Sequence, residues 1–188
     1  TPSGDHAEHT IQMSRYAKPI IVEKPMALTL EDADRMIEAC DRNGTRLFVV
    51  KQNRFNLPVQ KMFEAKEQGR FGKLVLGTVR VRWCRTQEYY DQDPWRGTWE
   101  HDGGVFANQA IHHVDLLNWM MGDVESVFAK STRALVNIEA EDTGVVVTQG
   151  GRHDTGVLEA LPAQFEHQAL LRVHGGGLAR RDAEEGRV

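Results

Sequence analysis

Over the first 53 residues, short apolar runs rich in β-branched residues alternate with segments of helical composition. The helical patterns cover residues 6–16 and 29–43, and the apolar runs cover residues 18–22 and 47–50. Thr29 is expected to cap the second helix, and Asn43-Gly44 is expected to end it. Strand, helix and strand in this order predict a βαβ unit with a parallel sheet and a right-handed crossover.

The pattern changes after residue 53, where several strands follow one another. Residues 74–85 alternate with a period of two, which indicates one long strand. The other expected helices are 57–68 and 107–121, and the other expected strands are 124–130, 134–138, 144–147 and 155–160. Residues 86–102 form a polar and aromatic loop, and a loop of this length inside a compact domain is usually functional.

These patterns divide the chain near residue 53. Residues 1–53 are expected to be part of a doubly wound α/β domain, and residues 54–160 an α+β domain with a mostly antiparallel sheet. Residues 161–188 have little apolar periodicity, so a disordered or aberrant tail is expected there. The chain opens on Thr1-Pro2-Ser3-Gly4, with no Met and no preceding strand, and we therefore expect a fragment or a processed chain.

Composition excludes several classes of function. A net charge of −4 over 188 residues does not favour a nucleic-acid partner. No apolar run is long enough to span a bilayer, so no membrane partner is expected. The two cysteines, Cys40 and Cys84, lie in different expected elements, which indicates reduced thiols and a cytoplasmic location.

Candidate chemistry is concentrated in two short segments. Lys24 follows an expected buried strand within Glu23-Lys24-Pro25, and burial there would lower its pKa. Asn108, His112 and Asp115 fall at positions i, i+4 and i+7, which places them on one face of a helix. A lysine, an imidazole and an amide are a suitable set for proton transfer at a sugar hydroxyl.

Each feature also has a plain structural interpretation. Lys24 can be an ordinary surface lysine before a helix. The helix face that carries Asn108, His112 and Asp115 can be an ordinary solvated face. Adjacent helical residues point about 100° apart, so His112 and His113 cannot easily chelate one ion and no metal site is expected; His113 is expected to pack against the strands. Gly103-Gly104 suits the close approach of a ligand to the backbone, and a simple turn equally well.

Taken in order, three segments resemble the glucose–fructose oxidoreductase / inositol dehydrogenase / MocA (Gfo/Idh/MocA) family of NAD(P)-dependent sugar oxidoreductases. They are Thr1 to His6, Glu23-Lys24-Pro25, and Gly103-Gly104 through His112 and Asp115. The resemblance implies that residues 1–53 are the C-terminal part of a dinucleotide-binding Rossmann domain. It also implies that Lys24 and His112 are the catalytic pair, with Asn108 beside them. The family often has an aspartate where this chain has Asn108, and an amide cannot shuttle a proton near neutral pH.

The same resemblance implies NAD as the cofactor, with NADP as the alternative. The residues implied to lie near it are Thr1, Pro2, His6, Glu23, Lys24 and Pro25. The sequence contains no G-x-G-x-x-G loop for a pyrophosphate. This chain alone is therefore expected to bind NAD weakly or not at all.

Residues 51–99 are similar to the branch of this family that acts on nucleotide sugars. The similarity implies that a substrate like UDP-N-acetylglucosaminuronate is oxidised at its C3 hydroxyl. Arginines suit its carboxylate or diphosphate, and aromatic rings suit its sugar and uracil faces. The expected substrate-binding residues are Arg54, Arg82, Arg85, Tyr89, Tyr90, Trp95, Arg96, Asn108 and Asp115.

Two other functions stay open. The chain can be a non-catalytic sugar-binding or scaffolding module, or a family dehydrogenase for an inositol or a simple sugar. The aromatic and arginine-rich loop argues against the simple sugar. Family members are commonly homo-oligomers, so a homo-oligomer is expected for the intact protein.

Overall fold

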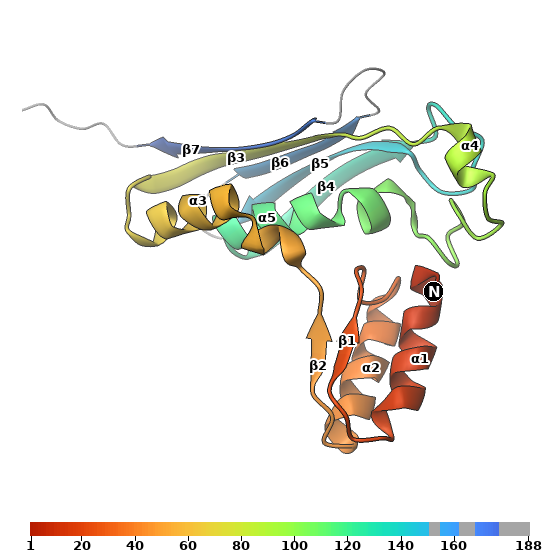
Figure 1. Cartoon of the computed structure of the whole chain (residues 1–188). Coiled ribbons are helices and arrows are strands. Elements are labelled where there is room, and N and C mark those ends of the chain that lie inside the picture. The colour runs from red at the N-terminus through yellow and green to blue at the C-terminus, as the bar shows by residue number, and fades with distance from the viewer. Residues whose placement is uncertain (151–154, 162–167, 177–188) are drawn as a thin grey trace, which may run out of the picture.

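The computed structural model describes residues 1–150, 155–161 and 168–176. A small βαβ unit stands beneath a larger five-stranded sheet (Figure 1). The chain passes from the unit to the sheet through η2 (Gln52–Phe55) and α3 (Leu57–Glu67). The candidate site lies where these two parts meet.

The βαβ unit consists of β1 (Ile20–Val22), α2 (Leu30–Arg42) and β2 (Leu47–Val49), and it is preceded by η1 (Ser3–Asp5) and α1 (His6–Ser14). The strands β1 and β2 pair in parallel. The Thr29 hydroxyl accepts a 3.1 Å hydrogen bond from the Asp32 N–H, which is the predicted helix cap. The βαβ unit expected from the sequence is confirmed.

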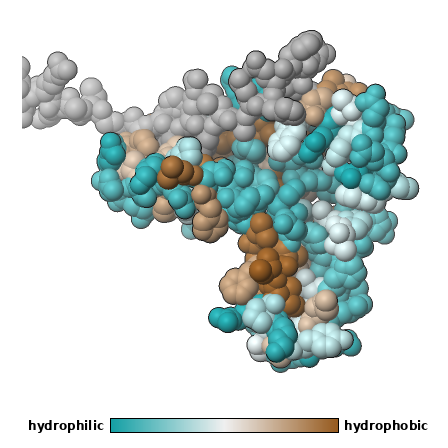
Figure 2. Space-filling model, in the orientation of Figure 1, coloured by the Kyte–Doolittle hydropathy of each residue, from teal (hydrophilic) through white to brown (hydrophobic). Residues whose placement is uncertain are grey.

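The two faces of the β1–β2 pair differ in burial. Both α1 and α2 lie on one face (Figure 1), where Ala7, Val22 and Met36 form a buried core. On the other face Ile21 and Phe48 lie opposite each other and are 75% and 48% exposed. Figure 2 shows the resulting apolar patch over β1 and β2.

The larger sheet has the strand order β4–β5–β6–β3–β7. Its strands are β3 (Lys73–Arg82), β4 (Val124–Thr132), β5 (Thr143–Gly150), β6 (Thr155–Leu161) and β7 (Gln168–Gly176). In this sheet β3 and β6 pair in parallel, and the other three pairs are antiparallel. The predicted α/β part followed by an α+β part with a mostly antiparallel sheet is confirmed.

Helix α5 (Ile111–Met121) lies along one face of this sheet (Figure 1). Helix α3 lies beside it, and the rings of Phe63 and Trp119 stack with centroids 3.8 Å apart. Gly77 in β3 allows α5 to come close, because a Cβ there would lie 2.9 Å from Leu117 Cδ1. The core between helix and sheet includes Val79, Val81, Val105, Ala110, Leu117, Leu158 and Ala160.

Residues 134–138 do not form the strand that the sequence predicts. The Asp142 carboxylate accepts hydrogen bonds from the backbone N–H groups of Ala134, Leu135 and Val136, at 2.9, 2.9 and 3.0 Å. A side-chain acceptor therefore takes the donors that a strand ladder needs, and the segment turns instead.

The strand β7 lies in the segment 161–188, for which a disordered or aberrant tail is expected. That expectation is wrong for Gln168–Gly176, which pair antiparallel with β3. Backbone pairing with the edge of β3 orders a strand whose own apolar periodicity is weak. Residues 162–167 and 177–188 of this segment lie outside the described residues.

A short helix, α4 (Gln87–Tyr90), interrupts the long loop between β3 and α5. Both Cys40 and Cys84 are free thiols. Within the described ranges, none of the helices is long and apolar enough to cross a membrane.

Candidate active site

Lys24 and Asn108 bring the two parts of the molecule together. Lys24 follows the end of β1, and its Nζ donates to the backbone carbonyl of Asn108 at 3.0 Å and to Asn108 Oδ1 at 2.9 Å. The two residues are 84 positions apart in the chain. Burial lowers the pKa of Lys24, and the carboxylates of Glu23 and Asp102 oppose that shift. The ammonium therefore releases its proton more readily than a free lysine does.

His6 fixes the turn that carries Lys24. The Lys24–Pro25 peptide bond is cis. The Pro25 carbonyl can only accept, so the buried His6 ring donates to it through Nδ1 over 2.8 Å. This contact ties α1 to the turn, and it occupies one ring nitrogen of a residue expected near the cofactor.

The segment that carries Asn108 is not part of α5. The sequence predicts one helix over 107–121, but the structure has a π-turn, η3 (Val105–Gln109), and then α5 from Ile111. The Ala110 N–H donates to the Val105 carbonyl at 2.7 Å, which is the wide spacing of a π-turn. Asn108, His112 and Asp115 therefore do not share one continuous α-helical face.

Glu141 explains this π-turn. Its backbone carbonyl accepts from Val105 N–H at 2.9 Å, and its carboxylate accepts from Phe106 N–H at 3.2 Å. Gly104 has a φ of +78°, and a Cβ there would collide with the Glu141 carboxylate. Gly103 likewise leaves room for Leu28. The close backbone approach predicted at Gly103-Gly104 is thus made by side chains of the protein.

His112 is neutral in this environment. It is 8% exposed, and its pKa is lowered by burial first and then by the positive charges of Lys24 and Lys51. The amide nitrogen of Gln52 lies 3.4 Å from His112 Nε2. With the Gln52 amide nitrogen as the donor, the lone pair is on Nε2 and the proton is on Nδ1, which is buried and has no hydrogen-bond partner among the described residues. Nε2 is then the atom that can accept a proton.

His113 is buried on the same helix. It is 8% exposed, and burial together with His112 lowers its pKa to about 4. It is therefore a neutral core residue at neutral pH.

Asp115 pairs with Arg54 and not with Lys24. Two hydrogen bonds of 2.7 Å join the Arg54 guanidinium to the Asp115 carboxylate, and Lys51 Nζ lies 3.7 Å away. The Arg54 guanidinium also lies over the Trp119 ring, 5.0 Å from its centroid. These contacts fix the start of the α3 region to α5. They occupy two residues that the sequence assigns to substrate binding.

The loop after β3 forms a column in which aromatic rings and guanidinium groups alternate. Arg85 lies between Trp83 and Tyr89, at 4.8 and 4.5 Å from the two ring centroids. Arg96 lies on Tyr89 and on Trp95, at 4.3 and 4.8 Å. Trp83, Arg85, Tyr89, Arg96 and Trp95 thus form one cluster held by cation–π contacts.

Two other expected substrate residues lie differently. Tyr90 is packed edge-on against Tyr89, and burial raises its pKa to about 12, so its phenol is neutral. Arg82 is exposed at the end of β3 and is not a member of the column. The roles of all these residues in substrate binding stay predictions.

Three residues of the site are not singled out by any sequence motif described above. They are Asp102, Gln52 and Glu141. Asp102 is 3% exposed and accepts from the Asn108 side-chain amide. Its sequence signal is an acid directly before Gly103-Gly104. Gln52 has a signal too, since it follows β2 at the edge of a parallel pair, where ligands bind.

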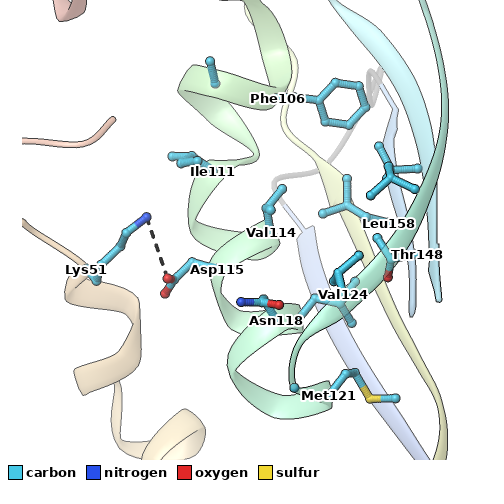
Figure 3. A pocket seen from close by; sticks show the side chains of 15 residues that line it. Lys51, Phe106, Ile111, Val114, Asp115, Asn118, Met121, Val124, Thr148 and Leu158 are labelled. Atoms are coloured by element: carbon cyan, nitrogen blue, oxygen red, sulfur yellow. Dashed lines mark ion pairs between the residues drawn. The ribbon is translucent and has the colours of Figure 1, made fainter. Parts of the chain in front are cut away.

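An apolar cavity of about 670 Å³ lies between α5 and the sheet (Figure 3). Its walls are mostly apolar side chains such as Phe106, Val114 and Leu158, and the Lys51–Asp115 ion pair lies at its rim. Neither Lys24 nor His112 lines this cavity. It adjoins the candidate site through Lys51 and Asp115 but does not contain the proposed catalytic pair.

Lys24 lies at the carboxyl edge of a parallel strand pair and contacts an amide from the second domain. This is the place where dinucleotide-binding folds hold their ligands, and the site therefore fits an oxidoreductase built on such a fold. Comparisons with known proteins agree with this class. Residues 1–51 match the oxidoreductase family with an NAD-binding Rossmann fold, and residues 59–176 match the GFO/IDH/MocA C-terminal domain. The chain belongs to the GFO/IDH/MocA family of oxidoreductases.

Solved structures of high similarity include two WlbA dehydrogenases in complex with NADH and UDP-GlcNAcA. The Bordetella pertussis protein is 46% identical with a TM-score of 0.89, over 93% of this chain and 55% of that one. The Chromobacterium violaceum protein is 43% identical with a TM-score of 0.88, over 93% and 51%. Myo-inositol 2-dehydrogenase of Thermotoga maritima is 32% identical over 90% of this chain and 51% of its own length. The chain thus spans about half the length of these relatives.

Proposed function

We propose that this chain is the catalytic part of an NAD-dependent dehydrogenase for a nucleotide sugar. The substrate would resemble UDP-N-acetylglucosaminuronate, and its C3 hydroxyl would be oxidised. The observation that carries the proposal is the contact of Lys24 Nζ with Asn108, beside a neutral His112. The similarity to the two WlbA dehydrogenases supports the substrate class.

The three side chains have complementary roles in this proposal. His112 Nε2 takes the hydroxyl proton as the C–H bond of the same carbon breaks. Lys24 donates to the oxygen as negative charge develops on it, and its lowered pKa lets it share that proton. The Asn108 carboxamide positions Lys24, because its Oδ1 accepts from the ammonium. NAD supplies the hydride acceptor for this reaction.

The residues present fit the nicotinamide end of NAD. Lys24 and Gln52 follow β1 and β2 at the carboxyl edge of a parallel pair, which is where doubly wound sheets bind dinucleotides. The 188-residue sequence holds no Gly-rich loop for the pyrophosphate. NAD is preferred to NADP because both WlbA relatives are described with NADH.

The arginine–aromatic column supports the nucleotide sugar over a simpler one. Arg85 and Arg96 offer two guanidinium groups in a cluster of three aromatic rings, and Arg96 Nε also donates to the Asp93 carboxylate at 2.9 Å. A uronate carboxylate or a diphosphate is the natural partner of such guanidinium groups. An inositol carries no such anion. It stays the second candidate substrate because of the similarity to the Thermotoga maritima enzyme.

A homo-oligomeric cytoplasmic enzyme with no nucleic-acid or membrane partner completes the proposal. The two free cysteines support a reducing compartment. The exposed apolar patch of Ile21 and Phe48 supports a covering surface in the intact protein, either further elements of the same domain or a second copy.

The test joins this chain to the N-terminal Rossmann half of a WlbA relative and measures NADH formation from NAD and UDP-N-acetylglucosaminuronate. We expect turnover, and we expect Lys24→Ala and His112→Ala each to reduce it by about 100-fold or more. Lys61→Ala and His9→Ala, at exposed positions, are the matched controls and should retain activity. Turnover with myo-inositol but not with the nucleotide sugar would make an inositol the substrate in place of the nucleotide sugar. Absence of turnover with every sugar would overturn the proposal.

A further inference from the structure

Asp102 connects the turn that carries Asn108 to the loop that carries the arginine–aromatic column. Its side chain is almost fully buried, at 3% exposure. One carboxylate oxygen accepts from the Asn108 side-chain amide, and the other accepts from the Gly97 N–H at 2.7 Å. Asp102 is thus the shared partner of two segments that the proposed reaction needs.

The orientation of the Asn108 carboxamide follows from this contact. An ionised carboxylate only accepts, so the Asn108 group that faces Asp102 has to be the NH₂. The opposite atom, Oδ1, then faces Lys24 and accepts from its ammonium at 2.9 Å. A reversed amide would place its oxygen against the Asp102 carboxylate and its NH₂ against the Lys24 ammonium. Both contacts would be repulsive, so Asp102 selects the orientation that binds Lys24.

Gly97 is fixed on its other side as well. Its carbonyl accepts from the N–H groups of Glu139 and Ala140, at 3.1 and 2.8 Å. A Cβ at Gly97 would lie 2.7 Å from the Cβ of Ile138, so the backbone is closely packed there. Gly97 directly follows Arg96, the arginine between Tyr89 and Trp95. Movement of Asp102 would therefore release both Asn108 and the end of the column.

We propose that Asp102 is a positioning residue with two effects. It sets the amide orientation of Asn108, and through Asn108 the position of the Lys24 ammonium. It also holds Gly97, and with Gly97 the arginine–aromatic loop, at a fixed place relative to Lys24 and Asn108. This inference rests on the proposed function for its kinetic consequence. Its structural consequence, the environment of Lys24, is independent of the substrate.

The substitution Asp102→Asn separates charge from shape. The Gly97 N–H is a fixed donor, so the oxygen of the new amide has to face it. The NH₂ of the new amide then faces Asn108, which turns over to present its oxygen. The Asn108 NH₂ would now point at Lys24. We expect turnover to fall by about 10–100-fold in the enzyme joined to the Rossmann half, with kcat affected more than KM.

The second variant restores the lost acceptor. In the double variant Asp102→Asn with Asn108→Asp, the new carboxylate accepts from the new amide and from Lys24 together. We expect this pair of changes to recover most of the lost turnover. Asn108→Asp alone places two carboxylates against each other, so its turnover should also fall. Recovery of turnover in the double variant relative to Asn108→Asp therefore tests the proposal even where Asp102→Asn folds poorly.

A second readout uses the 188-residue chain without substrate or cofactor. The pKa of Lys24 is followed through its ¹³Cε resonance by NMR. The charged groups that act on it are Glu23, Asp102, Arg85 and Lys51, and His112 also lies near it. Asp102→Asn should lower the Lys24 pKa below the wild-type value, and the double variant should raise it again. Asp123→Asn, at an exposed position, is the control and should leave it unchanged.

The outcomes separate this inference from the proposed function. If the Lys24 pKa falls in Asp102→Asn and rises again in the double variant, the role of Asp102 is supported. If the joined enzyme at the same time shows no turnover on any sugar, the proposed function is overturned and the role of Asp102 still stands. A Lys24 pKa unchanged in Asp102→Asn overturns the inference. Failure of the double variant to restore either the pKa or the turnover overturns it as well.

Discussion

Arg54 and Asp115 form a two-pronged ion pair that joins the segment after β2 to α5. Both hydrogen bonds measure 2.7 Å, and the side chains are 35% and 11% exposed. Asp115 lies on the same helix as His112, and Arg54 lies in η2, which directly follows the βαβ unit, so the pair joins the two parts of the molecule beside the candidate site. Its geometry needs the planar fork of arginine.

The first prediction concerns this pair. Because Arg54 is partly exposed, we expect a coupling of only about 1 kcal/mol between Arg54 and Asp115. A double-mutant cycle of Arg54→Ala and Asp115→Ala in urea unfolding measures it. Arg54→Lys keeps the positive charge but loses the two parallel N–H donors of the guanidinium, so most of the coupling energy should be lost. If the lysine variant kept the full coupling energy, the two-hydrogen-bond geometry would not be its source.

Gly104→Ala should strongly destabilise the protein. Gly104 has a φ of +78°, and a Cβ would collide with the Glu141 carboxylate that shapes the π-turn. Gly122 has a φ of +94° with nothing within 4 Å of its Cβ position, so Gly122→Ala reports the backbone strain alone. We expect Gly122→Ala to cost about 1 kcal/mol and Gly104→Ala about 2 kcal/mol more. Equal losses in chemical denaturation would mean that Glu141 moves aside freely.

His113 should make the protein sensitive to acid. Its pKa is about 4 in the folded chain against 6.5 when exposed, so the unfolded chain takes up a proton that the folded chain refuses. The destabilisation begins as the pH falls below 6.5 and is complete near pH 4. A shift of this size corresponds to about 3 kcal/mol.

The comparison of wild type with His113→Gln over this pH range measures the effect, and His9→Gln is the exposed control. The variant should lose less stability between pH 6.5 and pH 4 than the wild type does. Glu141 acts in the opposite direction, because burial raises the pKa of its carboxyl. That term is present in both proteins and cancels in the difference. Parallel curves would show that His113 is not the sensitive group.

The isolated chain should bind NAD weakly or not at all. The residues that fit the nicotinamide end are present, but the sequence has no Gly-rich loop to hold the pyrophosphate. Isothermal titration of the 188-residue chain with NAD tests this expectation, with the chain joined to a Rossmann half as the positive control. Micromolar affinity of the isolated chain would refute it.

Much of the fold follows from local sequence signals. The β1–α2–β2 unit is visible because its apolar runs are short and β-branched, and because Thr29 is a good cap for α2. The long strand β3 is visible from its period of two. The sequence motifs single out Lys24 and His112 as the catalytic pair with Asn108 beside them, and the structure brings Lys24 within hydrogen-bond distance of Asn108. Their catalytic roles stay predictions.

Side-chain carboxylates that bind backbone or amide groups outside their own element account for what the sequence did not predict. The carboxylate of Asp142 turns the segment 134–138 away from a strand, and the carboxylate of Glu141 converts the start of the expected helix into a π-turn. Asp102 acts in the same way on Asn108. In each case a side-chain carboxylate satisfies backbone or amide donors, and no local periodicity reports which donors it will reach.

The alternating column also gives the molecule an optical reporter for any anion that binds this loop. Trp83 and Trp95 stand at its two ends, each against a guanidinium group, and they are two of four tryptophans in the chain. An anion that draws Arg85 or Arg96 away from its ring changes the surroundings of an indole, and hence its emission. With Trp99 and Trp119 replaced by phenylalanine, the remaining fluorescence would report occupancy of the loop before any chemistry takes place.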